Sequence, residues 1–137
     1  MKKIILTCIL LLANINSFSY ANDQKNIQKT KNIQNNNIEI STKEAKKALI
    51  KKTHVFIDVR EQWEYDNGHI KGVNLIPMSN IDANSLKLDK SKKYITVCGA
   101  GVRSKTAAEK MKKLGLNVVS MSGGMNEWSE KGYPVNK

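Results

Sequence analysis

One short segment, residues 55–59, restricts the fold of this chain more than any other. It is a continuous apolar run, Val-Phe-Ile-Asp-Val, rich in β-branched residues and broken only by Asp58. A strand that is apolar on both sides is covered on both faces, which is typical of a parallel sheet packed between helices. We therefore expect residues 55–59 to form an interior strand of an α/β sheet.

Strand and helix patterns alternate on either side of this segment. Ser41 and Glu44 have the spacing of a capping box at the start of a first helix. Gly115 is placed to end a helix, and Gly123-Gly124 precedes a last helix that runs through Trp128. The other predicted strands are residues 73–76, 94–97 and 118–121, and the other predicted helices are residues 61–66, 81–88 and 104–114.

This alternation predicts an α/β fold with a mostly parallel central sheet and helices on both of its faces. The chain has 137 residues, which is enough for one domain with one core. We expect that domain to occupy residues 38–137. Residues 22–37 are rich in Asn, Gln and Lys and are predicted to be a disordered polar linker.

The first 21 residues have the pattern of a cleavable signal peptide. Lys2 and Lys3 precede a short apolar run, and the small residues Ser19 and Ala21 suit a signal peptidase. A retained membrane anchor is the main alternative. If this segment is cleaved, we expect the protein to be periplasmic or secreted, with no stable membrane insertion. Cleavage would also remove Cys8, so that Cys98 would be the one cysteine of the mature chain.

The formal net charge of +11 does not by itself predict a nucleic-acid partner. The lysines occur singly or in pairs along the whole chain, and no aromatic residues are interleaved with them to stack on bases. We interpret the charge as a solvated basic surface and expect no nucleic-acid binding.

Cys98 is the candidate nucleophile. It directly follows the strand predicted at residues 94–97, and in open parallel sheets ligands bind beyond the carboxyl ends of the strands. Gly99 and Gly101 can adopt the dihedral angles that turn backbone N–H groups towards one point, and Arg103 adds a permanent positive charge. We expect this loop to favour a thiolate and to bind an anion. The residues expected to bind the substrate are Gly99, Ala100, Gly101, Val102, Arg103 and Ser104.

Three segments carry signatures in a fixed order. They are Ile-Asp-Val-Arg-Glu with a later Gly-His-Ile in residues 57–77, Cys-Gly-Ala-Gly-Val-Arg-Ser in residues 98–104, and Gly-Gly-Met with a later Trp and Pro-Val in residues 123–135. On these motifs, the chain from Ile38 onward resembles a single-domain rhodanese in an exported form. The resemblance implies that Cys98 takes the outer sulfur of a donor such as thiosulfate, holds it as a persulfide and passes it to cyanide or a thiol.

The residues of the loop also agree with this chemistry. Inward-facing N–H groups stabilise a persulfide anion without a metal or bound cofactor. Arg103 is expected to hold the oxyanion end of the donor and to help sulfite leave. The expected partners are a small anionic sulfur donor and a thiophilic acceptor, which includes a possible protein acceptor.

Two alternatives stay open. Related phosphatase domains have the pattern Cys-x5-Arg with a His before the Cys, whereas this chain has Cys-x4-Arg and Val97. The second alternative is a persulfide carrier or thiol-binding module with little turnover of its own. Gly99 stands where many members of the family have a bulkier or basic residue, so the donor preference is open.

Four other polar residues, Asp58, Arg60, Glu64 and His69, are predicted to form a local network of ion pairs and hydrogen bonds. Asp58 and Arg60 are also expected to shape the site from behind the loop. His54 and His69 lack the ligand cluster of a zinc site, so no metal is predicted.

Overall fold

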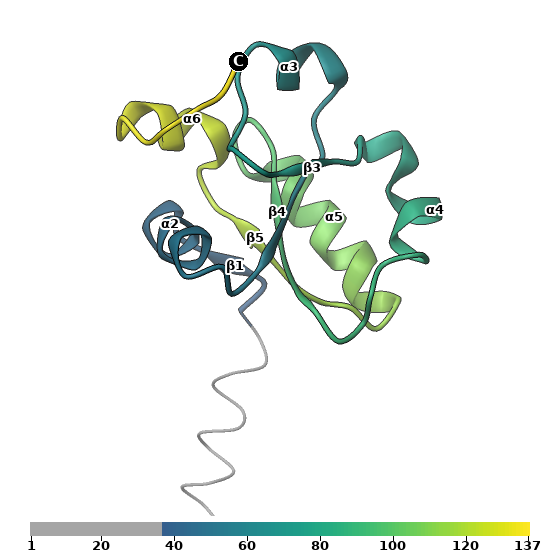
Figure 1. The fold of residues 1–137 in the computed structure, drawn as a ribbon. Helices are drawn as coiled ribbons and strands as arrows, with labels where there is room; N and C mark the ends of the chain where they lie inside the picture. The colour runs from purple at the N-terminus through teal and green to yellow at the C-terminus, as the bar shows by residue number, and fades with distance from the viewer. Residues whose placement is uncertain (1–36) are drawn as a thin grey trace, which may run out of the picture. The chain divides into compact units, whose positions relative to one another are not determined.

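The computed structural model describes residues 37–137, and the predicted signal peptide and nearly all of the predicted linker lie outside that range. Five strands form one sheet in the order β1-β5-β4-β2-β3, and every neighbouring pair is parallel (Figure 1). The strands are β1 (Glu39–Ile40), β2 (Val55–Asp58), β3 (Asn74–Leu75), β4 (Lys93–Val97) and β5 (Asn117–Met121). The helices are α2 (Thr42–Ile50), α3 (Gln62–Asp66), α4 (Ile81–Ser85), α5 (Val102–Lys113) and α6 (Gly124–Glu130), with a 3-10 turn at Met78–Asn80.

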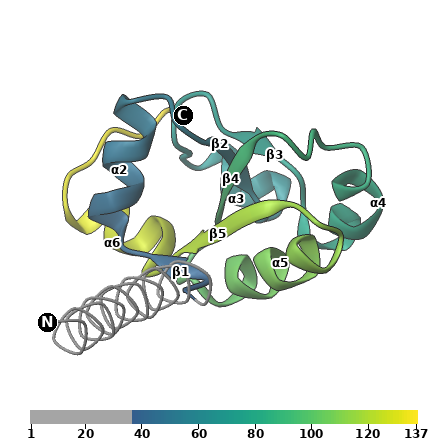
Figure 2. The ribbon, with the colours of Figure 1, turned by 90° about the horizontal axis from the view of Figure 1, so that it is seen from below.

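The sheet lies between two layers of helices, as the sequence predicts. Seen from below, α2 and α6 cover one face and α4 and α5 cover the other (Figure 2). Successive side chains of β4 alternate between these faces, so that Ile95 and Val97 belong to the core under α2 and α6. Tyr94 and Cys98 belong to the core under α4 and α5. The thiol therefore continues the buried face of β4 that packs against α5.

The capping box predicted for the first helix is confirmed. The Ser41 N–H donates to the Glu44 carboxylate at 2.9 Å, and the Glu44 N–H donates to Ser41 Oγ at 3.2 Å. These two contacts satisfy N–H groups that the first turn of α2 leaves without partners.

Several elements differ from the sequence prediction. The helix predicted at residues 81–88 ends at Ser85, and the strand predicted at residues 73–76 covers only Asn74–Leu75. The helix predicted at residues 104–114 begins at Val102, because Gly101 takes a left-handed φ of 93° and is itself the N-cap residue. Val102 and Arg103 are therefore in the first helical turn and not in the loop. The edge strand β1 was not predicted, because two residues give no periodic pattern; it pairs with β5 in the register Glu39↔Ser120.

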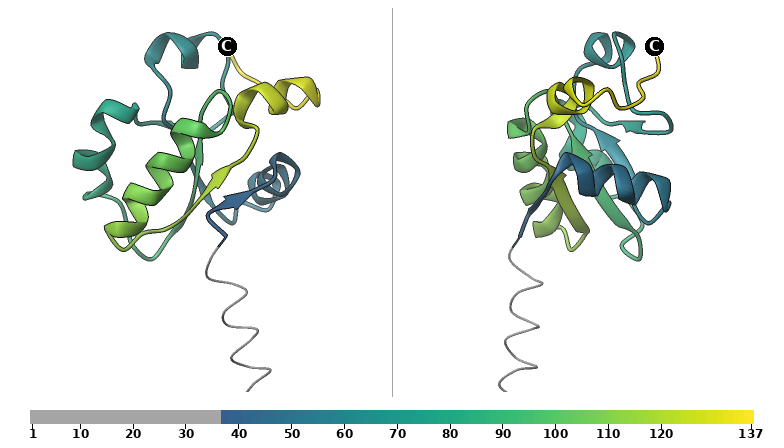
Figure 3. Two further views of the ribbon diagram at one scale, coloured as in Figure 1. Left: turned by 180° about the vertical axis from the view of Figure 1, so that it is seen from behind. Right: turned by 90° about the vertical axis from the view of Figure 1, so that its left-hand side faces the viewer.

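The C-terminal segment returns to the side of the molecule that carries α3 (Figure 3). His69 and Asn136 exchange two backbone hydrogen bonds, of 2.9 Å and 2.8 Å, in an isolated antiparallel bridge. Trp128 is fully buried and donates its indole N–H to the Pro134 carbonyl at 2.9 Å. Together these contacts place the last residues between α3 and α6. Within residues 37–137, no helix has both the length and the apolar character needed to cross a bilayer.

Candidate active site

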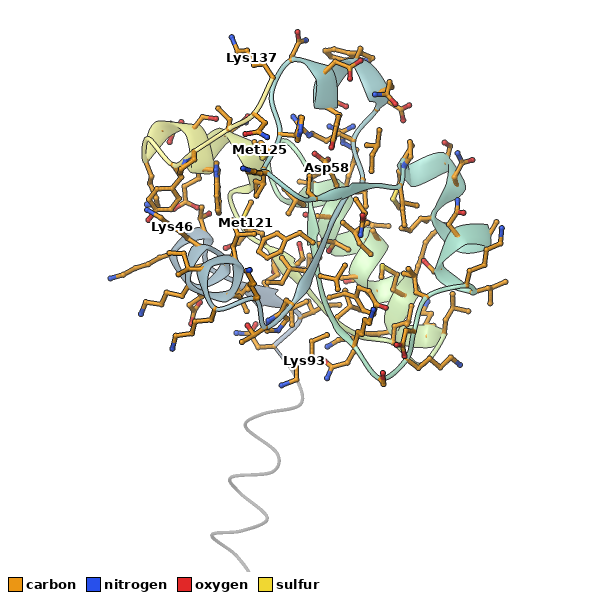
Figure 4. The ribbon with its side chains drawn as sticks, viewed as in Figure 1. Lys46, Asp58, Lys93, Met121, Met125 and Lys137 are labelled. Carbon is orange, nitrogen blue, oxygen red and sulfur yellow. The ribbon has the colours of Figure 1, made fainter. Side chains whose placement is uncertain are left out.

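The loop that starts at Cys98 lies between the ends of three elements. It leaves the carboxyl end of β4, enters α5 at Val102 and faces the first turn of α6. Figure 4 shows Asp58 and Met125 on the side of the molecule that carries this loop, and Lys93, the first residue of β4, at the opposite end. The Cys98 loop therefore lies at the carboxyl edge of the sheet, where the sequence places the candidate site.

The Cys98 sulfur has two polar neighbours. The Gly101 N–H donates to Sγ over a distance of 3.1 Å, and Ser104 Oγ lies 3.4 Å from Sγ. The whole residue is only 1% exposed, and it forms no disulfide. The sulfur is therefore held at a defined position on the floor of the loop, and one of the predicted inward-facing N–H groups contacts it.

Three buried hydroxyl groups, from Ser104, Ser120 and Thr96, form a hydrogen-bonded cluster on the protein side of the sulfur. Ser104 Oγ donates to the Gly101 carbonyl at 3.0 Å and lies 2.8 Å from Ser120 Oγ. Thr96 Oγ1 donates to the Ser104 carbonyl at 2.8 Å. Ser104 thus contacts the sulfur from the protein side and has no exposed surface. Thr96 and Ser120 were not singled out from the sequence, although a polar residue inside an otherwise apolar strand is the signal that could have found them.

The first turn of α6 determines which way the loop carbonyls point. The N–H groups of Met125 and Asn126 donate to the carbonyls of Cys98 and Gly99 at 2.8 Å and 2.9 Å. Gly124 has a φ of 57°, and a Cβ at this position would overlap both carbonyl oxygens. Only glycine permits this approach. Both carbonyl groups therefore point towards α6, where N–H donors compensate the partial negative charge of their oxygens.

Arg103 forms a bidentate ion pair with Glu64 of α3. Its two terminal nitrogens donate to the two carboxylate oxygens at 2.7 Å and 2.6 Å. The hydrogen bonds from Arg103 lower the pKa of Glu64 to about 2, against the opposing effect of burial. The same hydrogen bonds raise the pKa of Arg103. Arg103 lies at the rim as predicted, but its charge is already paired with a carboxylate, a contact between residues too distant in sequence to be predicted.

Asp58 and Arg60 form a second, buried pair behind the loop. Arg60 Nη2 lies 2.7 Å from Asp58 Oδ2 and donates to the Gly68 carbonyl at 2.8 Å. The Arg60 side chain is 8% exposed and the Asp58 side chain is 1% exposed. This pair links the end of β2 to the turn after α3, as expected of a structural network. His69 stacks on the Tyr65 ring with centroids 3.8 Å apart, and so also takes part in local packing.

A cleft lies beside the loop. It has a volume of about 350 Å³ and is lined by residues of α3, α6 and the C-terminal segment. Among residues 37–137, no three His, Cys, Asp or Glu side chains are grouped so as to hold a metal ion.

Comparison with known proteins gives concordant results. The family model of the rhodanese-like domain matches residues 41–131. The putative sulfurtransferase YtwF of Bacillus subtilis is 33% identical over 72% of this chain and 96% of its own length. The putative sulfur carrier protein YrkF of the same organism is 37% identical over 55% of this chain, a match that spans only 41% of that relative. A rhodanese-related protein from Thermoplasma volcanium superposes with a TM-score of 0.68 at 36% identity, covering 72% of this chain and 96% of that one.

Proposed function

Because the chain belongs to the family of rhodanese-like domains, we propose that it transfers a sulfane sulfur from an anionic donor such as thiosulfate to a thiophilic acceptor. The transferred sulfur is carried as a persulfide on Cys98. One observation carries this proposal: the Cys98 sulfur lies at the carboxyl edge of the sheet with the Gly101 N–H aimed at it over 3.1 Å. Such a donor stabilises negative charge on a nucleophilic sulfur and on its persulfide.

The two half-reactions balance without an added oxidant or reductant. In the first, the Cys98 thiolate attacks the outer sulfur of thiosulfate, the sulfur–sulfur bond of the donor breaks, and sulfite leaves with the bonding electron pair. In the second, cyanide or a thiolate attacks the terminal sulfur of the persulfide, and Cys98 leaves as a thiolate. The products of the second step are thiocyanate or an organic persulfide.

A persulfide carrier is the second candidate. The putative sulfur carrier protein among the relatives is the observation that favours it. A phosphatase is less well supported, since the spacing is Cys-x4-Arg and Arg103 is paired with Glu64.

One experiment separates these functions. The purified protein is incubated with thiosulfate, its intact mass is measured, and cyanide is then added and thiocyanate assayed; an aryl phosphate is offered in parallel. A sulfurtransferase gains one sulfur atom and releases thiocyanate repeatedly. A carrier gains the sulfur but releases thiocyanate slowly or not at all. Hydrolysis of the aryl phosphate with no gain of sulfur would overturn both proposals.

Replacing Glu64 with glutamine is expected to lower the KM for thiosulfate about three- to tenfold, or up to about 1.4 kcal/mol of binding free energy. The variant removes a negative charge that repels a dianionic donor and leaves the Arg103 charge uncompensated. Arg103 lowers the pKa of Glu64 from 4.5 to about 2, so the ionised form contributes stability that is fully present above about pH 5 and is lost progressively as the pH falls from there through about 2. The effect should therefore be constant between about pH 5 and 8, which steady-state kinetics at several pH values will check.

Asp66→Asn is the matched control for this variant. It makes the same change of charge on the same helix, but Asp66 accepts a hydrogen bond from Gln62 and not from Arg103. We expect its KM for thiosulfate to stay within twofold of the parent value. An equal change of KM in both variants would mean that the KM depends on the overall electrostatic field of the helix and not on the Glu64–Arg103 pair.

A further inference from the structure

The hydroxyl of Ser120 is linked to the Cys98 sulfur through one intermediate, Ser104. Ser120 lies on β5 two residues after Val118, so both side chains point to the face of the sheet that carries α5. Ser120 has no exposed surface, and within residues 37–137 its hydroxyl has a single hydrogen-bond partner, Ser104 Oγ at 2.8 Å. The half-reactions described above do not use this buried group.

The number of protons and lone pairs determines the direction of these hydrogen bonds. A serine hydroxyl has one proton to donate and two lone pairs that accept. Ser120 therefore donates to Ser104 Oγ, since the reverse direction would leave the buried Ser120 proton without an acceptor. The proton of Ser104 is left with two possible acceptors, the Gly101 carbonyl at 3.0 Å and the Cys98 sulfur at 3.4 Å.

The charge of the sulfur selects between these two acceptors. A neutral Cys98 thiol donates its own proton to the second lone pair of Ser104 Oγ, and the Ser104 proton stays on the Gly101 carbonyl. A thiolate has no proton to donate, so the Ser104 hydroxyl can turn and join the Gly101 N–H as a second donor to the sulfur. The Gly101 carbonyl keeps a partner in both arrangements, because the Lys105 N–H also donates to it at 3.1 Å.

We propose that Ser120 is a positioning residue that keeps the Ser104 hydroxyl in this switchable arrangement, so that Ser104 donates to the Cys98 sulfur whenever that sulfur is negatively charged. The inference rests on the sulfurtransferase function proposed above, in which the sulfur is a thiolate before it attacks the donor and again when it leaves the persulfide. No covalent bond of either serine breaks, and only the direction of one O–H bond changes. The hydrogen bond from Ser120 polarises the Ser104 hydroxyl and strengthens its donation to the sulfur.

The charged side chains on the elements around the sulfur are unchanged when Ser120 is replaced. The hydrogen bonds from Glu64 raise the pKa of Arg103, and the charges of Glu64, Cys98 and Asp58 act in the same direction. A changed titration of Cys98 in a Ser120 variant therefore reports the lost hydroxyl and not a lost charge. These charged side chains form four ion pairs: Arg103 with Glu64, Arg60 with Asp58, Lys105 with Glu39, and Lys131 with Glu127.

The test is a titration of the Cys98 thiolate by its ultraviolet absorbance. Each protein is titrated beside the same protein carrying Cys98→Ser, and the difference removes the signals of Cys8 and of the tyrosines. The proteins compared are the wild type, Ser120→Ala, Ser104→Ala and the double variant. Ser85→Ala is the matched control, because Ser85 is also buried but its hydroxyl has no hydrogen-bond partner within residues 37–137.

We expect the midpoint of the titration to rise by about half a unit to one unit in Ser120→Ala, since a hydrogen bond of this kind changes an equilibrium about three- to tenfold. The midpoint should stay within about 0.2 units in Ser85→Ala, and Ser120→Ala should shift it by less than about 0.2 units when Ser104 is already alanine. For the same reason, transfer from the loaded protein to cyanide should be about three- to tenfold slower in Ser120→Ala.

An unchanged midpoint in Ser120→Ala would overturn the role assigned to Ser120. So would an equal shift with and without the Ser104 hydroxyl, because Ser120 would then act on the sulfur by another route. A wild-type protein that takes up no sulfur from thiosulfate would overturn the sulfurtransferase proposal instead, and the titration would still decide whether Ser120 acts on Cys98.

Discussion

Replacing Cys98 with serine is expected to abolish sulfur uptake from thiosulfate, with at least a 1,000-fold loss of turnover, roughly the scale seen when a covalent nucleophile is removed. A serine hydroxyl cannot form the persulfide. It can still accept the hydrogen bond from Gly101 and remain beside Ser104 Oγ, so the fold should persist. The intact mass after incubation with thiosulfate measures the uptake, and urea unfolding measures the stability, which we expect to change by about 1 kcal/mol or less.

A thiol at another position provides the control for this variant. Thr106 is exposed on α5, and Cys98→Ser combined with Thr106→Cys restores one thiol without the contacts of the loop. We expect this double variant to stay inactive, since its sulfur lacks the Gly101 N–H. Recovery of thiosulfate turnover would show that any accessible thiol suffices, and would contradict the role assigned to the loop.

The features that could be predicted from the sequence are those that depend on residues close together in the chain. The apolar run that predicts β2 is five residues long, and the capping box that predicts the start of α2 spans four residues. The parallel sheet and the position of Cys98 at its carboxyl edge follow from the order of such local signals. The start of α5 was predicted two residues late, because glycine adopts either sign of φ and the sequence does not show that Gly101 takes the left-handed φ of 93° that makes it the N-cap residue.

The parts that could not be predicted join residues distant in sequence. The Glu64–Arg103 ion pair bridges α3 and α5, and no local pattern marks either residue as the partner of the other. The same is true of the hydroxyl contacts from Ser104 to Ser120 and from Thr96 to Ser104. Arg103 was expected to hold the donor, to help sulfite leave and to favour the Cys98 thiolate. Its pairing with Glu64 changes the charge that a donor meets, which is a property of the folded chain.

Gly124 gives the second large effect, because it is the residue that lets α6 approach the loop. Gly124→Ala places a methyl group where the carbonyl oxygens of Cys98 and Gly99 lie, and it also imposes a left-handed φ of 57° on a residue with a Cβ. The left-handed conformation alone costs about 1–2 kcal/mol. Backbone atoms cannot give way as a flexible side chain does, so the hydrogen bonds from Met125 and Asn126 to the loop must lengthen or break.

We expect Gly124→Ala to lower the free energy of unfolding by about 3–5 kcal/mol and to slow persulfide formation by about 100-fold in the molecules that remain folded. Gly132→Ala is the matched control, because Gly132 has a similar φ of 64° but no atom within 4 Å of an added Cβ. That variant should lose only the conformational term of about 1–2 kcal/mol and keep its rate. Urea unfolding and single-turnover sulfur uptake separate the two effects. Equal losses of stability and rate in both variants would mean that left-handed strain accounts for the whole effect. A larger loss confined to Gly124→Ala would show that the contact between α6 and the loop carbonyls holds the Cys98 sulfur in its reactive position.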